Sequence, residues 1–76
     1  MKVKYDSEVD AAYVYFNGKI SPGEVKQTIT LNNSLIVDLD RKGKLLGLEI
    51  LDASRNLTKQ ALGEFSHSKK PHVTTV

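Results

Sequence analysis

Two neighbouring segments in the middle of the chain alternate apolar and polar residues, and they constrain the fold more than any other feature. In residues 34–39 and 44–51 the larger apolar side chains recur at every second position: Leu35, Val37, Leu39, Leu46, Leu48 and Ile50. A period of two is the period of a half-buried β-strand. The residues between the two segments, 40–43, are polar and end in glycine, which predicts an antiparallel hairpin with one apolar face.

The length of this turn decides whether the two apolar sets share a face. Turns of two or four residues place them together, and a turn of three does not. A two-residue turn would hold Lys42 at positive φ, which a long side chain resists. A four-residue turn needs positive φ only at Gly43, so the sequence favours a four-residue turn.

The same strand signals continue towards the N-terminus. Residues 2–5, 11–16 and 24–31 alternate or are rich in aromatic and β-branched side chains, and polar turns at 6–10, 17–23 and 32–33 separate them. After Leu51 the period becomes helical, behind Asp52 or Ser54 as a cap. The apolar residues at helical spacing are Leu57, Ala61, Leu62 and Phe65.

The predicted fold class is therefore α+β. We expect a small antiparallel β-meander of four to five strands with a C-terminal helix. Residues 1–65 form the single β-rich domain with its helix, and residues 66–76, which include Lys69 and Lys70, form a basic, mobile tail.

The small size of the chain predicts self-association. A chain of 76 residues buries only about 60–65% of the surface that its unfolded form exposes. It has no cysteine, so no disulfide or thiolate metal site can add stability. We expect a homo-oligomer, with a dimer favoured. No segment is long and apolar enough to predict a membrane association, and the cysteine-free composition fits a cytoplasmic protein.

A second apolar face is predicted on the central hairpin. Ile36, Leu45 and Leu51 fall opposite the main apolar set in the alternation. One C-terminal helix cannot cover both faces of a sheet, and uncovered apolar surface on a small domain is typical of a partner or dimer contact.

The charge distribution leaves two partner classes open. Residues 1–53 carry seven Lys or Arg against eight Asp or Glu, whereas residues 54–76 carry four against one. The cations of the second part, Arg55, Lys59, Lys69 and Lys70, could contact an acidic protein or, nonspecifically, phosphates. Tyr13 and Tyr15 share one face of a predicted strand and could stack bases. Nucleic-acid binding is the alternative function.

The patterns that could indicate metal or catalytic chemistry are incomplete. Asp38, Asp40, Gly43 and Glu49 match a calcium-binding loop in spacing, but Lys42 stands at a ligand position and the flanks are strands. We therefore expect no metal or cofactor. A hydrolase could use the acids of the turn at 6–10, but both histidines, His67 and His72, lie in the predicted tail. We expect no enzymatic activity.

Two segments carry a family resemblance. Residues 4–14 (KYDSEVDAAYV) and 36–54 (IVDLDRKGKLLGLEILDAS) are similar to the domain-of-unknown-function family 2283, a group of small bacterial and archaeal proteins. The resemblance spans about residues 1–57 and implies an antiparallel sheet followed by a helix. It implies no activity and no catalytic residues, and it suggests an antitoxin-like role. The leading hypothesis is a non-enzymatic interaction module, of unknown biochemical role, that binds a protein partner.

Overall fold

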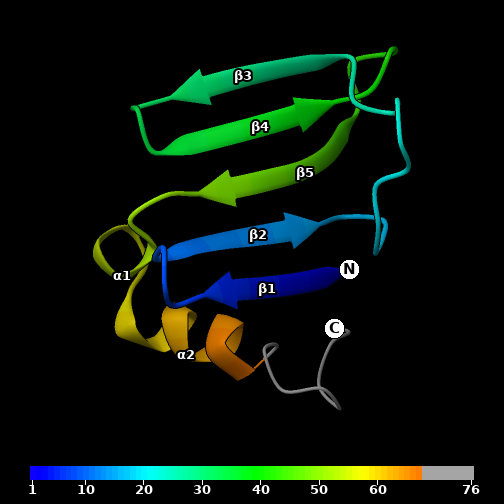
Figure 1. Cartoon of the computed structure of the whole chain (residues 1–76). Helices are drawn as coiled ribbons and strands as arrows, with labels where there is room; N and C mark the ends of the chain where they lie inside the picture. The colour runs from blue at the N-terminus through cyan, green and yellow to red at the C-terminus, as the bar shows by residue number, and fades with distance from the viewer. Residues whose placement is uncertain (68–76) are drawn as a thin grey trace.

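The computed structural model describes residues 1–67 and confirms the predicted α+β class (Figure 1). The chain forms β1 (Lys2–Asp6), β2 (Ala11–Tyr15), β3 (Gln27–Leu31), β4 (Leu35–Leu39), β5 (Leu45–Ile50), α1 (Ala53–Asn56) and α2 (Lys59–His67). All five strands belong to one antiparallel sheet. The predicted tail lies, apart from its first two residues at the end of α2, outside the described residues.

The strand order, β1-β2-β5-β4-β3, contains one crossover. After β2 the chain runs along one end of the sheet to the far edge, where β3 begins (Figure 1). It then returns through two hairpins, so that β5 lies between β4 and β2. The connection, residues 16–26, is longer than the loop predicted at 17–23, since β2 ends at Tyr15 and β3 begins only at Gln27.

The register aligns apolar residues into two rows across the sheet. One row joins Val14, Leu48, Val37 and Ile29, and the other joins Ala12, Ile50, Leu35 and Leu31. Side chains at directly paired positions point to the same face of a sheet. One face is therefore apolar across four strands, as the alternation predicted.

The turn between β4 and β5 differs in length from the prediction. Residues 40–44 separate the strands, and the Gly43 N–H donates to the Asp40 carbonyl oxygen at 3.0 Å. A turn of odd length would place the two apolar sets on opposite faces. A β-bulge corrects this, because Leu39 pairs with Leu45 but Asp38 pairs with Gly47. The positive φ predicted for Gly43, +79°, is confirmed.

The predicted single helix is two helices with different caps. Leu57 is extended, with φ −110° and ψ 149°, and separates α1 from α2. Thr58 is the N-cap of α2, since its Oγ1 accepts from the Ala61 N–H at 3.0 Å. Asp52 occupies the predicted N-cap position of α1 but makes no side-chain cap, and Ser54, the alternative cap, instead donates its hydroxyl to Asp10.

The cap of α1 comes from the turn between β1 and β2. The carbonyl oxygen of Asp10 accepts from the Ala53 N–H at 2.9 Å, and its Oδ1 accepts from the Ser54 N–H at 3.0 Å. Asp10 sits at φ 54°, a left-handed conformation that aspartate tolerates better than most residues. This turn therefore fastens the sheet to the start of the helical segment.

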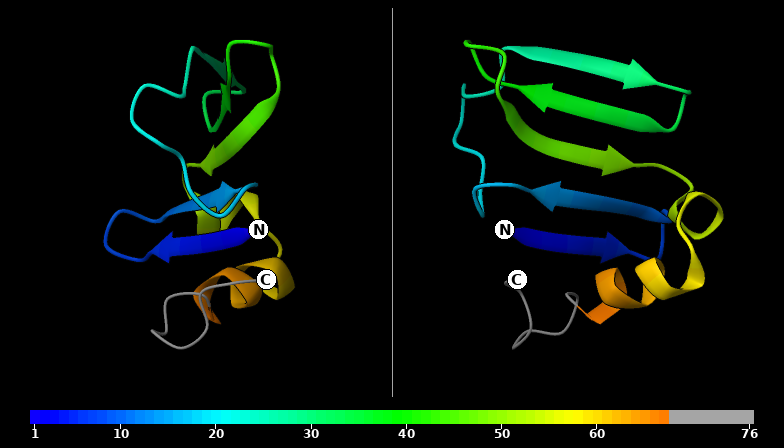
Figure 2. Two further views of the ribbon diagram at one scale, coloured as in Figure 1. Left: turned by 90° about the vertical axis from the view of Figure 1, so that its right-hand side faces the viewer. Right: turned by 180° about the vertical axis from the view of Figure 1, so that it is seen from behind.

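The buried core lies at one side of the sheet. The buried apolar residues are Val3, Ala12, Val14, Leu46, Ile50 and Ala53. The helical segment adds Leu57, Leu62 and Phe65, which pack against the cluster of Ala12, Ile50 and Ala53. Figure 2 shows α2 at the β1 border of the sheet, with β3 and β4 at the opposite border. The helix therefore covers only part of the apolar face.

Candidate interaction surface

The part of the apolar face over β3, β4 and β5 is open. Ile29 and Leu31 of β3 are 38% and 47% exposed. Their partners Val37 and Leu35 on β4, together with Leu48 on β5, are only half-buried. We call these five residues the open face. Of the residues predicted to form the main core, Leu46 and Ile50 are buried, whereas Leu35, Val37 and Leu48 contribute to this open apolar surface.

An apolar hollow continues the open face towards α2. Its volume is about 370 Å³, and Leu48 belongs to both surfaces. Its lining residues are Met1, Val3, Val14, Phe16, Leu48, Glu64 and Phe65. Met1 and Phe16 are 53% and 36% exposed. Glu64, on α2, supplies the one charged side chain of this lining.

The second face of the sheet is polar and tied together by hydrogen bonds. The Tyr13 hydroxyl donates to Asp38 Oδ2, and the Thr28 hydroxyl donates to Asp38 Oδ1 at 2.8 Å. The Tyr13 ring reaches Asp38 by crossing Gly47, where a Cβ would overlap the ring and its hydroxyl. Burial, followed by the hydrogen bond to Asp38, raises the pKa of Tyr13. Tyr13 therefore stays protonated and acts as a structural donor.

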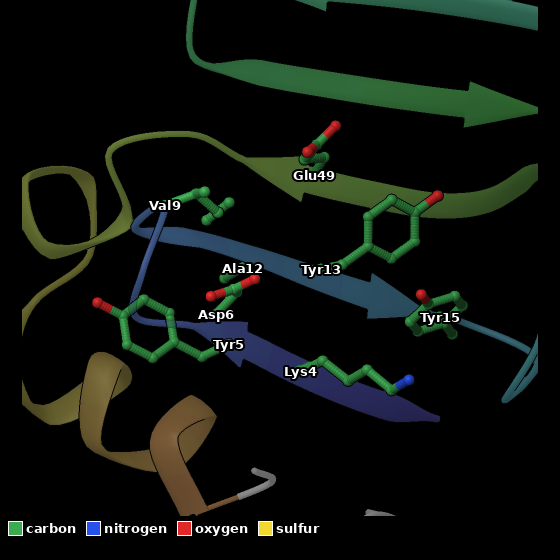
Figure 3. Close-up of a pocket in the computed structure, with 9 residues that line it drawn as sticks. Lys4, Tyr5, Asp6, Val9, Ala12, Tyr13, Tyr15 and Glu49 are labelled. Atoms are coloured by element: carbon green, nitrogen blue, oxygen red, sulfur yellow. The ribbon is translucent and has the colours of Figure 1, made fainter.

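A shallow hollow of about 480 Å³ lies on the second face over β1 and β2 (Figure 3). Its walls include the rings of Tyr13 and Tyr15, whose centroids are 4.5 Å apart. The Lys4 ammonium lies 5.8 Å from the Tyr15 ring centroid. Carboxylates of Asp6 and Glu49 share the same lining. The charge around the aromatic pair is mixed, so the hollow has no basic character to attract phosphates.

The predicted nucleic-acid residues do not form one site. Tyr13 and Tyr15 lie in the middle and at the end of β2, on the side away from α1 (Figure 1). Arg55 and Lys59 lie on α1 and at the start of α2, at the other end of the strands. Lys69 and Lys70 lie outside the described residues. Nucleic-acid binding stays a prediction, and in the described residues the tyrosines of β2 and the cations of the helical segment do not share a surface.

The three residues predicted to form a second apolar face lie at separate places: Ile36 on β4, Leu45 at the start of β5 and Leu51 just after its end. Ile36 does lie on the second face, paired with Thr30 and Glu49. Leu45 lies at the bulge, where the alternation is interrupted, and is 53% exposed. Leu51 follows the end of β5, and its N–H donates to the Ser34 carbonyl oxygen at 2.8 Å. Leu45 and Leu51 are thus about 20 Å apart along the strand.

Asp10, in the β1–β2 turn, and Asp40, in the β4–β5 turn, accept structural hydrogen bonds from side chains and backbone. Asp10 Oδ2 accepts from the Ser54 hydroxyl at 2.7 Å, and Oδ1 accepts from the Tyr5 hydroxyl at 2.8 Å. These bonds, the Ser54 one first, lower the pKa of Asp10. Asp40 Oδ1 accepts from the N–H groups of Lys42 and Lys44 at 2.8 and 2.9 Å, and its pKa is lowered chiefly by the Lys44 bond.

Neither set of acids forms a metal centre in the described part of the chain. No three His, Cys, Asp or Glu side chains of residues 1–67 come together in a way that could hold an ion. The acids that matched a calcium-binding loop in spacing have separate structural roles. Asp38 accepts hydrogen bonds from two hydroxyl groups, and Asp40 accepts the backbone N–H groups that close the β4–β5 turn. Within the same residues, neither helix has the length and apolar character needed to cross a membrane.

The open face could not be found by inspecting local sequence patterns. The alternation identified its residues but assigned them to a covered core. The missing information was the strand order, because the pairing of β2 with β5 places α2 beside β1 rather than over β4. Local sequence patterns do not encode that long-range pairing.

The comparisons with known proteins concern the sheet. A family model described as "Protein of unknown function (DUF2283)" matches residues 2–54, which contain the five strands and the start of α1. No curated protein and no solved structure matches the chain.

Proposed function

The chain belongs to the DUF2283 family of proteins of unknown function, and from its open face we propose that it is a non-enzymatic module that binds an amphipathic helix of a partner protein. The observation that carries this proposal is the pair of apolar rows that continues beyond the reach of α2, onto β4 and β3. An antitoxin-like role, predicted from the family resemblance, would be one instance of such binding.

The dimensions of the sheet favour a helix as the occupant. Neighbouring strands lie about 4.8 Å apart, so five strands give a sheet roughly 20 Å wide. A helix with its side chains is about 10 Å across, so two helices are needed to cover one face. The described chain places one, α2, at the β1 border. The remaining width over β3, β4 and β5 fits one further helix.

The chemistry of the surface defines the partner helix further. Ile29, Val37 and Leu48 form a continuous aliphatic row across three strands, which suits side chains recurring at helical spacing. Glu64 borders the adjoining hollow and is exposed. A Lys or Arg beside the apolar stripe of the partner helix would pair with it.

Catalysis has weaker support in the described residues. Asp10 is the acid with the most perturbed surroundings in the turn at 6–10, and both of its oxygens already accept structural hydrogen bonds. A general base needs an oxygen or nitrogen that is open to its substrate.

Selection from a library of displayed peptides tests the proposal. We expect selected peptides to carry apolar residues at positions i, i+3, i+4 and i+7, and to shift the methyl resonances of Ile29, Leu31, Val37 and Leu48. Val37→Glu places a carboxylate at the centre of the open face and should weaken binding about tenfold or more. Val9→Glu, at a position that is 68% exposed in the β1–β2 turn, is the matched control and should bind normally.

Two outcomes would contradict the proposal. One is that the selected peptides have no helical period. The other is that they bind Val37→Glu and Val9→Glu equally well while both variants keep the circular dichroism spectrum of the parent chain.

A further inference from the structure

β3 forms an exposed edge of the sheet. It is last in the strand order and pairs only with β4, and all five of its residues are exposed. No other element of residues 1–67 lies beyond it, as both views of the sheet show (Figures 1 and 2). Its outer backbone N–H and C=O groups are therefore available to another strand.

This edge has none of the usual features that prevent strand pairing. Its sequence, QTITL, has no charge and no proline, and its pairing with β4 is regular from Gln27 to Leu31. The opposite edge differs, since β1 carries Lys2, Lys4 and Asp6 and α2 packs against it. Charges and covering elements are what natural proteins use to protect edges, so β3 has the character of an interface.

The order of residues in β3 makes the strand complementary to itself. An antiparallel pair centred on Ile29 places Ile29 opposite Ile29, Thr28 opposite Thr30, and Gln27 opposite Leu31. Thr–Thr and aliphatic pairs of this kind are favourable across strands, and no like charges meet. A shift by one residue would place apolar side chains on the polar face. Centring on Ile29 also pairs the full length of the strand.

We propose that two copies of this chain associate through β3, antiparallel and centred on Ile29, to form one continuous sheet. The two-fold axis is perpendicular to the sheet, so both open faces lie on the same side. The dimer uses the edge of β3 and leaves the face over β4 and β5 free. It therefore adds to the helix-binding function and does not depend on it.

Charge substitutions at the axis test the proposal. Ile29→Lys and Ile29→Glu each place like charges opposite one another, and each should reduce the mass in light scattering from twice 8.4 kDa to 8.4 kDa. Mixing the two variants in equal amounts should restore the doubled mass, because opposite charges then meet. Val9→Lys, which adds the same charge in the β1–β2 turn, should remain dimeric. So should Val37→Glu, the variant that tests the open face.

Hydrogen exchange on the unsubstituted chain gives a second measurement. Protection of the amides of residues 27–31 should rise with protein concentration, while that of residues 2–6 should not change. A parent chain that is monomeric at high micromolar concentration would overturn the proposal. So would dimeric single variants, a mixture that stays monomeric, or protection of residues 27–31 that is independent of concentration.

Discussion

Gly47 permits the contact that organises the second face, and replacing it tests how that face is packed. The Tyr13 ring lies over the Gly47 backbone, and its hydroxyl donates to Asp38 on the next strand. In Gly47→Ala the new Cβ would overlap the ring. The Tyr13 side chain must then rotate away from β5 and lose its hydrogen bond, because the strand backbone cannot shift without disturbing the ladder on both sides.

The expected cost follows from three contributions. A hydrogen bond to a charged group contributes about 1.5–3 kcal/mol. Because the bond between Tyr13 and Asp38 is only part-buried, water weakens it and we take roughly 1 kcal/mol. Exposing about 40 Å² of ring and backbone surface costs about 1 kcal/mol. Alanine in a strand interior recovers about 0.5–1 kcal/mol relative to glycine. The net loss is about 1–1.5 kcal/mol, or roughly 4–12 °C in Tm for a domain of this size.

Thermal and urea unfolding of four chains would measure this coupling: the parent, Gly47→Ala, Tyr13→Ala and the double variant. All must be compared at one protein concentration, because association makes Tm concentration-dependent. In the Tyr13→Ala background, Gly47→Ala should be neutral or stabilising. Gly63→Ala is the control for glycine replacement, since nothing lies within 4 Å of its Cβ position on α2. An equal cost of Gly47→Ala in both backgrounds would refute the contact.

Three further substitutions have defined outcomes. Gly43→Val should destabilise the fold by about 1 kcal/mol or more in urea unfolding, since a β-branched residue resists a φ of +79°; an unchanged midpoint would contradict this. Thr58→Ala removes the α2 cap and should cost about 1 kcal/mol in the same measurement. The pKa of Asp10 is lower in the folded chain than its ordinary value of 3.8. The ionised Asp10 side chain therefore contributes fully to stability above about pH 5, and this contribution is lost as the pH falls below 3.8 and through the pKa of the folded state. Asp10→Asn should therefore unfold with less change in Tm between pH 6 and pH 3 than the parent, and an identical pH profile would contradict this.

The strands were predictable because each is specified by its own residues. Alternation, or a run of aromatic and β-branched residues, between polar turns is a local signal, and it located all five strands. Gly43 was predictable for the same reason, since the steric cost of a positive φ does not depend on the rest of the fold.

The turn length was not predictable, although its consequence was. For the two apolar sets to share a face, the number of residues between the paired positions has to be even, and no particular number is required. A four-residue turn meets this condition. The observed turn, residues 40–44, meets it as well once the extra residue at the β-bulge is added. The sequence therefore predicts that Val37 and Leu48 share a face without distinguishing between these two solutions.

The cap of α1 and the open face depend on contacts between distant residues. Asp10 and Ser54 are 44 residues apart, so no local capping pattern could connect them. Both depend on β5 pairing with β2, which brings the end of β5 to the β1–β2 turn. The same pairing draws the helical segment towards β1 and away from β4.

The uneven burial that results connects the fold to the two proposed surfaces. Among the described residues, every buried apolar one lies on β1, β2, β5 or at the start of α1, whereas all five residues of β3 are exposed and all five of β4 are half-buried. Local stability follows buried apolar contacts, so the β3–β4 hairpin is the part of the sheet that gains most from added cover. A helix over Val37 would bury its face, and a second copy beside Ile29 would pair its edge. Both associations stabilise the same hairpin, so each should strengthen the other. Helical peptides that bind the open face should therefore lower the protein concentration at which the dimer forms.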